Sequence, residues 1–133
     1  MKTALVTGGS RGIGKAICLK LAQEGYHMLI NYTSRDDEAQ KTLSEIEALG
    51  GTGELMKFDV SNYQQAHEAI ENWQKANEWE YIEVLVNNAG IRRDNVMAFM
   101  PEEDWHRVLG IALDGFFNVT QPIVSQMLVH KYG

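Results

Sequence analysis

The sequence predicts an α/β fold with a doubly wound parallel sheet, in which helices cover both faces of the strands. Short apolar runs rich in β-prone residues alternate with segments that have the helical period of about 3.6 residues. Strands that alternate with helices at this spacing pair in parallel through right-handed crossovers. The 133 residues are 44% hydrophobic and 23% charged, and no linker divides them, which indicates one domain over residues 1–133.

The short apolar runs predict four strands, at Thr3–Thr7, His27–Tyr32, Glu54–Val60 and Glu83–Asn87. Helical patterns fill the intervals between them, at residues 13–25, 34–49 and 61–78. Capping boxes are expected at the starts of the last two of these helices, where Ser34 pairs with Asp37 and Ser61 with Gln64.

A long final helix is expected after a loop over residues 88–100. Pro101 suits its first turn, whereas Pro122 lacks a backbone donor and is expected to bend it. The apolar positions of this helix keep a helical period. These positions are Trp105, Val108, Leu109, Ala112, Leu113, Phe116, Val119, Ile123 and Met127.

The composition excludes several kinds of partner and site. A net charge of −6 disfavours nucleic acid, because phosphate backbones are bound by clustered Lys and Arg. No apolar run approaches the roughly 20 residues of a membrane span, and the start does not read as a signal peptide. Cys18 is the only cysteine, and the four histidines lie too far apart for a local metal motif. We therefore expect a cytoplasmic protein without a structural metal.

The segment TGGSRGIG at Thr7–Gly14 stands between a predicted strand and a predicted helix. Glycines there let the backbone turn sharply, let a pyrophosphate approach and let the helix pack close to the sheet. Free amides and the positive end of the helix dipole favour an anion. A glycine-rich turn chosen only for its geometry is the alternative. The agreement of strand, loop and helix favours a Rossmann-type dinucleotide site formed by Gly8, Ser10, Arg11, Gly12, Ile13 and Gly14.

The end of the second strand predicts which dinucleotide binds. An NAD site places Asp or Glu there to accept from the ribose 2′-hydroxyl, whereas this chain has Thr33, Ser34 and Arg35. Arg11 and Arg35 could clamp a 2′-phosphate, and Ser34 could donate to it. Alternatively, Arg35 is solvated and Asp36 or Asp37 accepts from the ribose. We favour a capping role for Asp37 and NADP over NAD.

Three motifs together resemble the short-chain dehydrogenase/reductase family. They are TGGSRGIG at Thr7–Gly14, the pair Asp59-Val60 after the third strand, and NNAG at Asn87–Gly90 after the fourth. Further segments look most like the 3-oxoacyl-acyl-carrier-protein reductases, with acetoacetyl-CoA reductases as close neighbours. These segments are Asn87–Met100, Glu102–Trp105 and Phe116–Gln121.

The resemblance implies further cofactor-binding residues. Asp59 and Val60 would lie along the adenine, and the nicotinamide-side ribose would be lined by Asn87, Ala89 and Gly90. Two of these residues also have a structural interpretation, since Asp59 could cap the turn before Ser61 and Asn87 could bond to backbone at the strand end.

The same resemblance implies a catalytic Ser, Tyr and Lys, with the Lys four residues after the Tyr that protonates the carbonyl oxygen. None of the five tyrosines has a lysine at that spacing. We therefore assign no catalytic residue and expect a chain truncated after the fourth strand and the long helix. Ala112 stands where the family usually has an asparagine that supports a relay water, and a core helix residue is its simpler interpretation.

The expected function is NADPH-dependent reduction of 3-oxoacyl thioesters, linked to acyl carrier protein or CoA, to 3-hydroxyacyl thioesters in fatty-acid synthesis. The chain alone is expected to be inactive. One alternative is a non-catalytic nucleotide-binding or assembly module. Another is a different short-chain dehydrogenase, such as an acetoacetyl-CoA reductase or an enzyme that uses a sugar or steroid.

The resemblance also implies a homo-oligomer, tetrameric at full length, because the long helix packs subunit against subunit in the family. Trp105, Phe116, Phe117 and Met127 have two interpretations, a partner face or core packing. Lys131 either contacts an acidic carrier protein or, as we favour, stabilises the helix end. The apolar strand at Glu83–Val86 would form an open edge, so we expect the isolated chain to be marginally stable or to associate.

Overall fold

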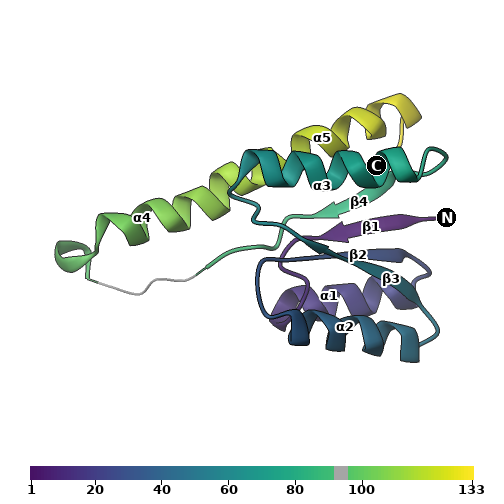
Figure 1. The fold of residues 1–133 in the computed structure, drawn as a ribbon, viewed down its shortest axis with the longest axis horizontal. Helices are drawn as coiled ribbons and strands as arrows, with labels where there is room; N and C mark the ends of the chain where they lie inside the picture. The colour runs from purple at the N-terminus through teal and green to yellow at the C-terminus, as the bar shows by residue number, and fades with distance from the viewer. Residues whose placement is uncertain (92–95) are drawn as a thin grey trace.

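The computed structural model describes residues 1–91 and 96–133, which form three layers with helices on both faces of a parallel sheet (Figure 1). The strands are β1 (Thr3–Val6), β2 (His27–Tyr32), β3 (Thr52–Lys57) and β4 (Ile82–Val86). Their order is β3-β2-β1-β4, and every neighbouring pair is parallel. The predicted doubly wound α/β class is therefore confirmed.

Two pairs of helices cover the sheet. One face is covered by α1 (Gly12–Gln23) and α2 (Asp36–Ala48), and the other by α3 (Tyr63–Ala76) and α5 (Gly115–His130) (Figure 1). A short 3-10 helix η1 (Met97–Phe99), helix α4 (Glu102–Leu109) and a π-helical segment η2 (Gly110–Asp114) precede α5. Part of the predicted loop over residues 88–100 lies outside the described residues, at 92–95.

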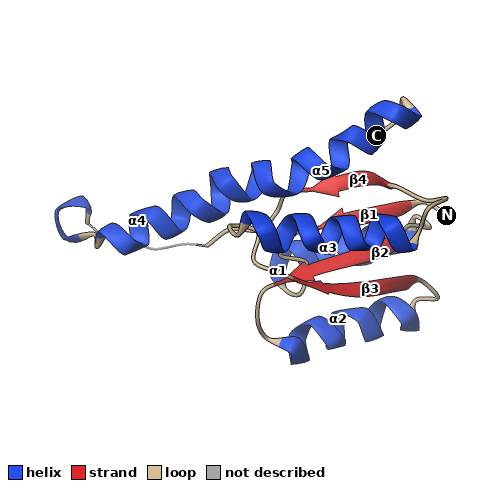
Figure 2. Cartoon of the chain, turned by 45° about the horizontal axis from the view of Figure 1, so that its top comes forward, coloured by secondary structure: helices blue, strands red, loops and turns tan. Residues whose placement is uncertain are grey.

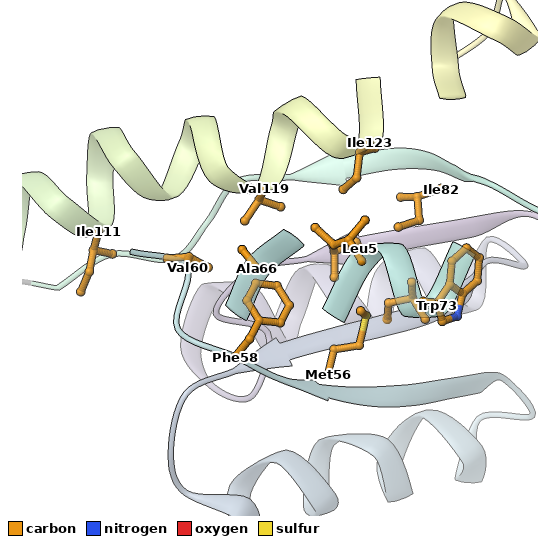
Figure 3. Packing of buried hydrophobic residues seen from close by; sticks show 12 residues of the cluster. Leu5, Met56, Phe58, Val60, Ala66, Trp73, Ile82, Ile111, Val119 and Ile123 are labelled. Carbon is orange, nitrogen blue, oxygen red and sulfur yellow. The ribbon is translucent and has the colours of Figure 1, made fainter. Parts of the chain in front are cut away.

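Alternate residues of the strands point into two hydrophobic cores, one on each face of the sheet. In β1, Leu5 enters the core beneath α3 and α5, whereas Ala4 and Val6 enter the core beneath α1 and α2. Figure 3 shows Leu5 among Val119 and Ile123 of α5 in the first core. Full burial of such a side chain stabilises the fold by roughly 1.5–3 kcal/mol. The sheet is thus fixed between helices on both sides, and the strand ends are held in place.

The fourth strand has the character that the sequence predicts. Among the described residues β4 pairs with β1 alone, in a register that brings Leu85 opposite Leu5. Ile82 and Leu85 contact the core on one face, and Val84 and Val86 contact the core on the other. The strand is therefore apolar on both faces at the edge of this sheet.

The third strand ends earlier than predicted, at Lys57 rather than Val60. Residues 58–60 leave the sheet and run toward the long helix, where Asn118 Nδ2 donates to the Val60 carbonyl oxygen at 2.9 Å. The side chains of Phe58 and Val60 are buried in the core there. The apolar run in the sequence is therefore longer than the strand, because its last residues pack against a helix.

The long helix runs through α4, η2 and α5 (Figure 2), and only some of its periodic apolar positions are buried. Trp105, Leu113 and Phe116 are exposed, and the buried positions are instead Ile111, Gly115, Asn118, Val119 and Ile123. The π-helical turn η2 changes which residues face the sheet, because its hydrogen bonds span one more residue than those of an α-helix. Of the aromatic and methionine residues with two interpretations, only Met127 packs against the core.

The same helix has two other notable properties. It continues through Pro122, so the predicted bend there stays a prediction. By length and composition, Glu102–His130 is the one helix within the described ranges that could cross a membrane. Its α5 part packs against α3 and β4, which accounts for the buried apolar positions of that part.

Both predicted capping boxes are wrong. The residue before α2 is Arg35, with a φ of 64°, and no side chain caps that helix. At α3 the cap lies one residue later than predicted, because the Asn62 side chain accepts a hydrogen bond from the Gln65 amide at 3.0 Å. The Ser61 hydroxyl instead donates to Asp59 Oδ1 at 2.7 Å and accepts from Arg107 Nη1 at 3.2 Å.

The single cysteine gives a test of the packing beneath the loop between β1 and α1. Burial raises the pKa of the Cys18 thiol to about 12, and the thiolate is the reactive form. We expect alkylation of native protein at pH 8 to be about 100-fold slower, or more, than alkylation of denatured protein. Mass spectrometry after timed exposure to iodoacetamide measures both rates. Equal rates would show that this core is open.

Candidate functional site

The loop between β1 and α1 lies tightly against its own helix. Gly8 has a φ of +64° and Gly12 a φ of +58°, a region that favours glycine. A Cβ atom on Gly14 would overlap the Gly8 carbonyl oxygen, so α1 approaches the loop only because residue 14 has no side chain. A Cβ atom on Gly12 would instead meet no atom within 4 Å. Main chain at Gly12 therefore borders open space.

The first turn of α1 provides unpaired donors. Arg11 precedes the helix and its side chain does not cap it. The Lys15 amide donates to the Arg11 carbonyl oxygen at 3.2 Å, while the amides of Gly12, Ile13 and Gly14 have no backbone partner in the part of the chain that is described. With the positive end of the helix dipole, these amides form a site that favours an anion such as a phosphate.

A buried asparagine in β2 joins the loop to β3. Asn31 Oδ1 accepts a hydrogen bond from the Gly8 amide at 3.2 Å, and the Asn31 carbonyl oxygen accepts one from Gly9 at 2.9 Å. Its Nδ2 atom donates to the carbonyl oxygens of Met56 and Phe58, at 3.3 and 3.0 Å. Our sequence analysis did not select Asn31, although a polar residue within the apolar run HMLINY was a signal for it.

The segment after β4 is joined to the loop in a similar way. Thr7 Oγ1 accepts hydrogen bonds from the amides of Asn88 and Ala89, each at 3.0 Å. Asn88 Nδ2 donates to the carbonyl oxygens of Thr7 and Gly8, at 3.1 and 3.2 Å. The sequence analysis assigned Asn87 and passed over Asn88, yet Asn88 is the asparagine that contacts the glycine loop.

These segments border a groove of about 410 Å³ at the carboxyl ends of the strands. Twelve predicted site residues line it, namely Gly8, Arg11, Gly12, Ile13, Gly14, Thr33, Ser34, Arg35, Asp59, Val60, Ala89 and Gly90. The lining also includes residues that the sequence analysis missed: Asn31, Tyr32, Asn88, Ile91, Arg107 and Ile111. The structure thus brings together segments that are far apart in the sequence.

Two predicted site residues lie outside this groove. Ser10 is buried, and its carbonyl oxygen accepts a hydrogen bond from Thr42 Oγ1 at 2.7 Å, which fixes the loop to α2. Asn87 Nδ2 donates to Thr120 Oγ1 at 3.1 Å, so its amide contacts α5. Neither residue is among those that line the groove.

The part of the groove next to β2 is formed by Thr33, Ser34 and Arg35, without a carboxylate in that segment. The Arg35 guanidinium lies 3.0 Å from Glu38 Oε1 and is more than half exposed. Asp36 does not line the groove. Its pKa is held below the usual range, first by the hydrogen bond from Lys57 Nζ and then by the one from the Tyr32 hydroxyl.

The charges of the groove differ from those of the whole chain. Among the described residues, Arg11, Arg35 and Arg107 line it together with one carboxylate, Asp59, whereas the chain has a net charge of −6. A concave surface with mainly positive groups raises the local concentration of anions. The groove is therefore electrostatically suited to a ligand with several phosphates.

Asp59 caps the turn before Ser61, which is one of the two interpretations from the sequence, and it also lines the groove. Its Oδ1 atom accepts hydrogen bonds from the Ser61 amide at 3.0 Å and the Ser61 hydroxyl at 2.7 Å. Arg107 Nη1 lies 3.3 Å from Asp59 Oδ2. Burial alone would raise the pKa of Asp59, but the bonds from Ser61 and the charge of Arg107 outweigh it and lower the pKa.

A hollow of about 180 Å³ adjoins the groove between Ala89 and the long helix. Its other lining residues are Thr7, Val60, Asn87, Ile111, Ala112, Leu113, Gly115 and Phe116, none of which has an acidic or basic side chain. Ala112 belongs to the π-helical segment η2. The described residues also contain no cluster of His, Cys, Asp or Glu that could hold a metal ion. The hollow therefore offers shape without an acid or base of its own.

Comparison with known proteins agrees with this geometry. The model of the short chain dehydrogenase family matches residues 2–133. A 3-oxoacyl-acyl-carrier-protein reductase FabG of Staphylococcus epidermidis is 39% identical over 132 residues, which are 99% of this chain and 53% of that protein. A reductase of the same name from Aggregatibacter actinomycetemcomitans is 42% identical over 127 residues, 96% of this chain and 52% of that protein. The chain spans about half the length of the curated relatives that it matches.

Solved structures show the same arrangement. A metagenomic short-chain oxidoreductase in complex with NADP has a TM-score of 0.92 at 27% identity, covering 99% of this chain and 59% of that one. A gluconate 5-dehydrogenase from Burkholderia cenocepacia in complex with NADP and tartrate has a TM-score of 0.88 at 32% identity, covering 99% and 51%. With the matching family model, these likenesses show that the chain belongs to the short-chain dehydrogenase family.

Proposed function

We propose that this chain forms the NADP(H)-binding portion of a reductase that converts 3-oxoacyl thioesters to 3-hydroxyacyl thioesters. The observation that carries the cofactor assignment is the groove itself. It combines unpaired amides at Gly12, Ile13 and Gly14 with the guanidinium groups of Arg11 and Arg35. Amides at a helix start suit a diphosphate, and arginines beside a strand end without a carboxylate suit an additional 2′-phosphate.

The rest of the groove fits the remaining parts of the dinucleotide. The 2′-phosphate would lie between Arg11, Ser34 and Arg35, with Thr33 beside it. The adenine would lie along Asp59 and Val60, at the wall formed by the segment after β3.

The nicotinamide-side ribose would be placed at Ala89 and Gly90, where the groove meets the smaller hollow. Asn87 and Ser10 would support this arrangement from outside the groove, through their hydrogen bonds to α5 and α2.

The bound cofactor would supply a hydride, and the described residues would bind and orient the cofactor. The hollow between Ala89 and η2 is where a carbonyl substrate would approach, but its lining has no group that could protonate the carbonyl oxygen. Relatives named 3-oxoacyl-acyl-carrier-protein reductase support a thioester on acyl carrier protein, or its CoA counterpart, as the substrate.

A second candidate is the oxidoreduction of a sugar acid, which the likeness to the gluconate 5-dehydrogenase favours. The absence of an acid or base from the hollow is also what a non-catalytic nucleotide-binding module would show. The relatives named 3-oxoacyl-acyl-carrier-protein reductase are 39% and 42% identical to this chain, against 32% for the gluconate 5-dehydrogenase, so we place 3-oxoacyl thioesters first.

We further propose that the protein is a cytoplasmic homo-oligomer. Apolar side chains on the outer side of the long helix remain exposed, among them Trp105, Leu113, Phe116 and Phe117. Large exposed apolar side chains on one helix suit a contact with another copy of the same helix.

The substrate class can be tested with the protein in the length that its gene encodes. The assay follows NADPH absorbance with acetoacetyl thioesters of acyl carrier protein and of CoA, and with 5-ketogluconate as the competing substrate. We expect turnover of the thioesters and little or none of the sugar acid. Preferred use of the sugar acid would support the second candidate, and no turnover despite NADPH binding would support a non-catalytic module.

The two arginines predict cofactor preference. We expect Arg11→Ala and Arg35→Ala each to weaken NADP⁺ binding by about tenfold or more, because each removes a charged hydrogen bond to the 2′-phosphate. NAD⁺ lacks this phosphate, so its affinity should change by less than about threefold. Calorimetric titration measures both affinities. Lys41→Ala is the control, since Lys41 is an exposed cation of α2 outside the groove. Parallel loss of both cofactors would contradict the assignment.

Two glycines form a matched pair that tests the phosphate loop. Gly12 and Gly25 both have a positive φ, of 58° and 92°, and a Cβ atom on either would meet nothing within 4 Å. Gly12→Ala and Gly25→Ala should therefore destabilise the fold similarly, by about 1 kcal/mol. Only Gly12→Ala should lower dinucleotide affinity, by about tenfold or more, because its new methyl group enters the groove. Equal affinities of the two variants would contradict phosphate binding at this loop.

A further inference from the structure

We propose that Arg107 is a positioning residue that holds the Asp59 carboxylate at the groove wall, so that Asp59 selects a base with an exocyclic amino group. This inference rests on the proposed binding of an adenine dinucleotide. It concerns a residue of α4, an element that the sequence analysis did not connect with the cofactor.

The first step is the geometry around the carboxylate. Arg107 Nη1 donates to Asp59 Oδ2 at 3.3 Å and to Ser61 Oγ at 3.2 Å. The Ser61 hydroxyl in turn donates to Asp59 Oδ1 at 2.7 Å. One guanidinium thus contacts both residues of the turn, and both carboxylate oxygens have a partner on the protein.

The Asp59 carboxylate keeps free acceptor capacity on the side of the groove. Each carboxylate oxygen can accept about two hydrogen bonds, so Oδ2 keeps acceptor capacity after Arg107 has bound. Asp59 and Arg107 both line the groove. An ionised carboxylate accepts and cannot donate. It therefore favours adenine, whose 6-amino group donates, over hypoxanthine, whose carbonyl oxygen at the same position accepts.

The long helix is attached to the segment after β3 from two sides. Asn118 Nδ2 donates to the Val60 carbonyl oxygen at 2.9 Å, and a Cβ atom on Gly115 would lie 2.8 Å from Val60 Cγ2. These contacts fix the α5 side of the segment after β3. Helix α4 lies on the other side of η2 and has no buried residue. Arg107 therefore attaches this helix to the same segment, through its hydrogen bond to Asp59.

The exposure of the Arg107–Asp59 ion pair favours a positioning role for Arg107 over a structural one. The Arg107 side chain is 44% exposed and that of Asp59 24% exposed. An ion pair this exposed contributes little to the stability of a fold, typically below about 1 kcal/mol. The same pair can still set the orientation of one carboxylate, and a site built to hydrogen-bond one group rejects an analogue that lacks it. Loss of Arg107 should thus change base preference more than stability.

The test compares NADP⁺ with its analogue in which hypoxanthine replaces adenine, by calorimetric titration of the protein as its gene encodes it. We expect the wild type to prefer NADP⁺, and Arg107→Ala to reduce the preference ratio by about three- to tenfold. Affinity for the hypoxanthine analogue should stay nearly constant. Arg107→Lys should recover part of the preference, since it keeps a cation and a donor near Asp59.

Controls keep the outcomes distinct. His106→Ala removes the exposed neighbour that pairs with Glu102 outside the groove, and it should leave the ratio unchanged. Asp59→Asn should abolish the preference, which gives a second variant if Arg107→Ala folds poorly. Failure of the wild type to bind either dinucleotide would overturn the proposed function itself. Normal NADP⁺ binding with the same ratio in wild type and Arg107→Ala would overturn only the role of Arg107.

Discussion

The candidate site depends on buried hydrogen bonds that close the carboxyl end of β1. Thr7, Asn31 and Asn88 use side-chain atoms to bind the backbone of three different segments, and together they hold the β1 end of the glycine loop. Breaking one of them would leave a buried polar group unsatisfied, at a cost of roughly 1–3 kcal/mol. The loop therefore keeps one conformation, and the amides at the start of α1 are oriented before an anion arrives.

The opposite wall of the groove is a product of tertiary packing. Asp59 and Val60 follow β3 but are held by residues of α4 and α5, and η2 joins these two helices. The absence of a side chain at Gly115 lets the helix come close enough for the Asn118 bond to Val60. A change in the long helix can consequently alter the base end of the groove while the phosphate end, fixed by β1 and β2, stays unchanged.

Local patterns predicted most of the fold and the glycine turn between β1 and α1, because both depend on periodicity and on glycine at fixed spacing. The residues that the sequence analysis missed act over long range. Asn31 reads as part of an apolar strand, and Arg107 reads as a charge in the last turn of a helix, until the fold brings them to the groove. The sequence did not show which apolar positions of the long helix are buried for a related reason, since no local pattern marked the π-helical turn η2.

Charged residues lie at one end of the candidate site, and an uncharged hollow lies at the other end. Arg11 and Arg35 line the part of the groove next to β2, whereas the hollow beside Ala89 and Ala112 has no charged lining residue. Interactions with a remote phosphate hold a long ligand in one orientation and so reduce the entropy lost when its reactive end meets a second molecule. The described lining of the hollow places no competing ion pair at that end. Among the described residues, the charged groups that suit a phosphate are therefore separated from the uncharged hollow at the other end of the site.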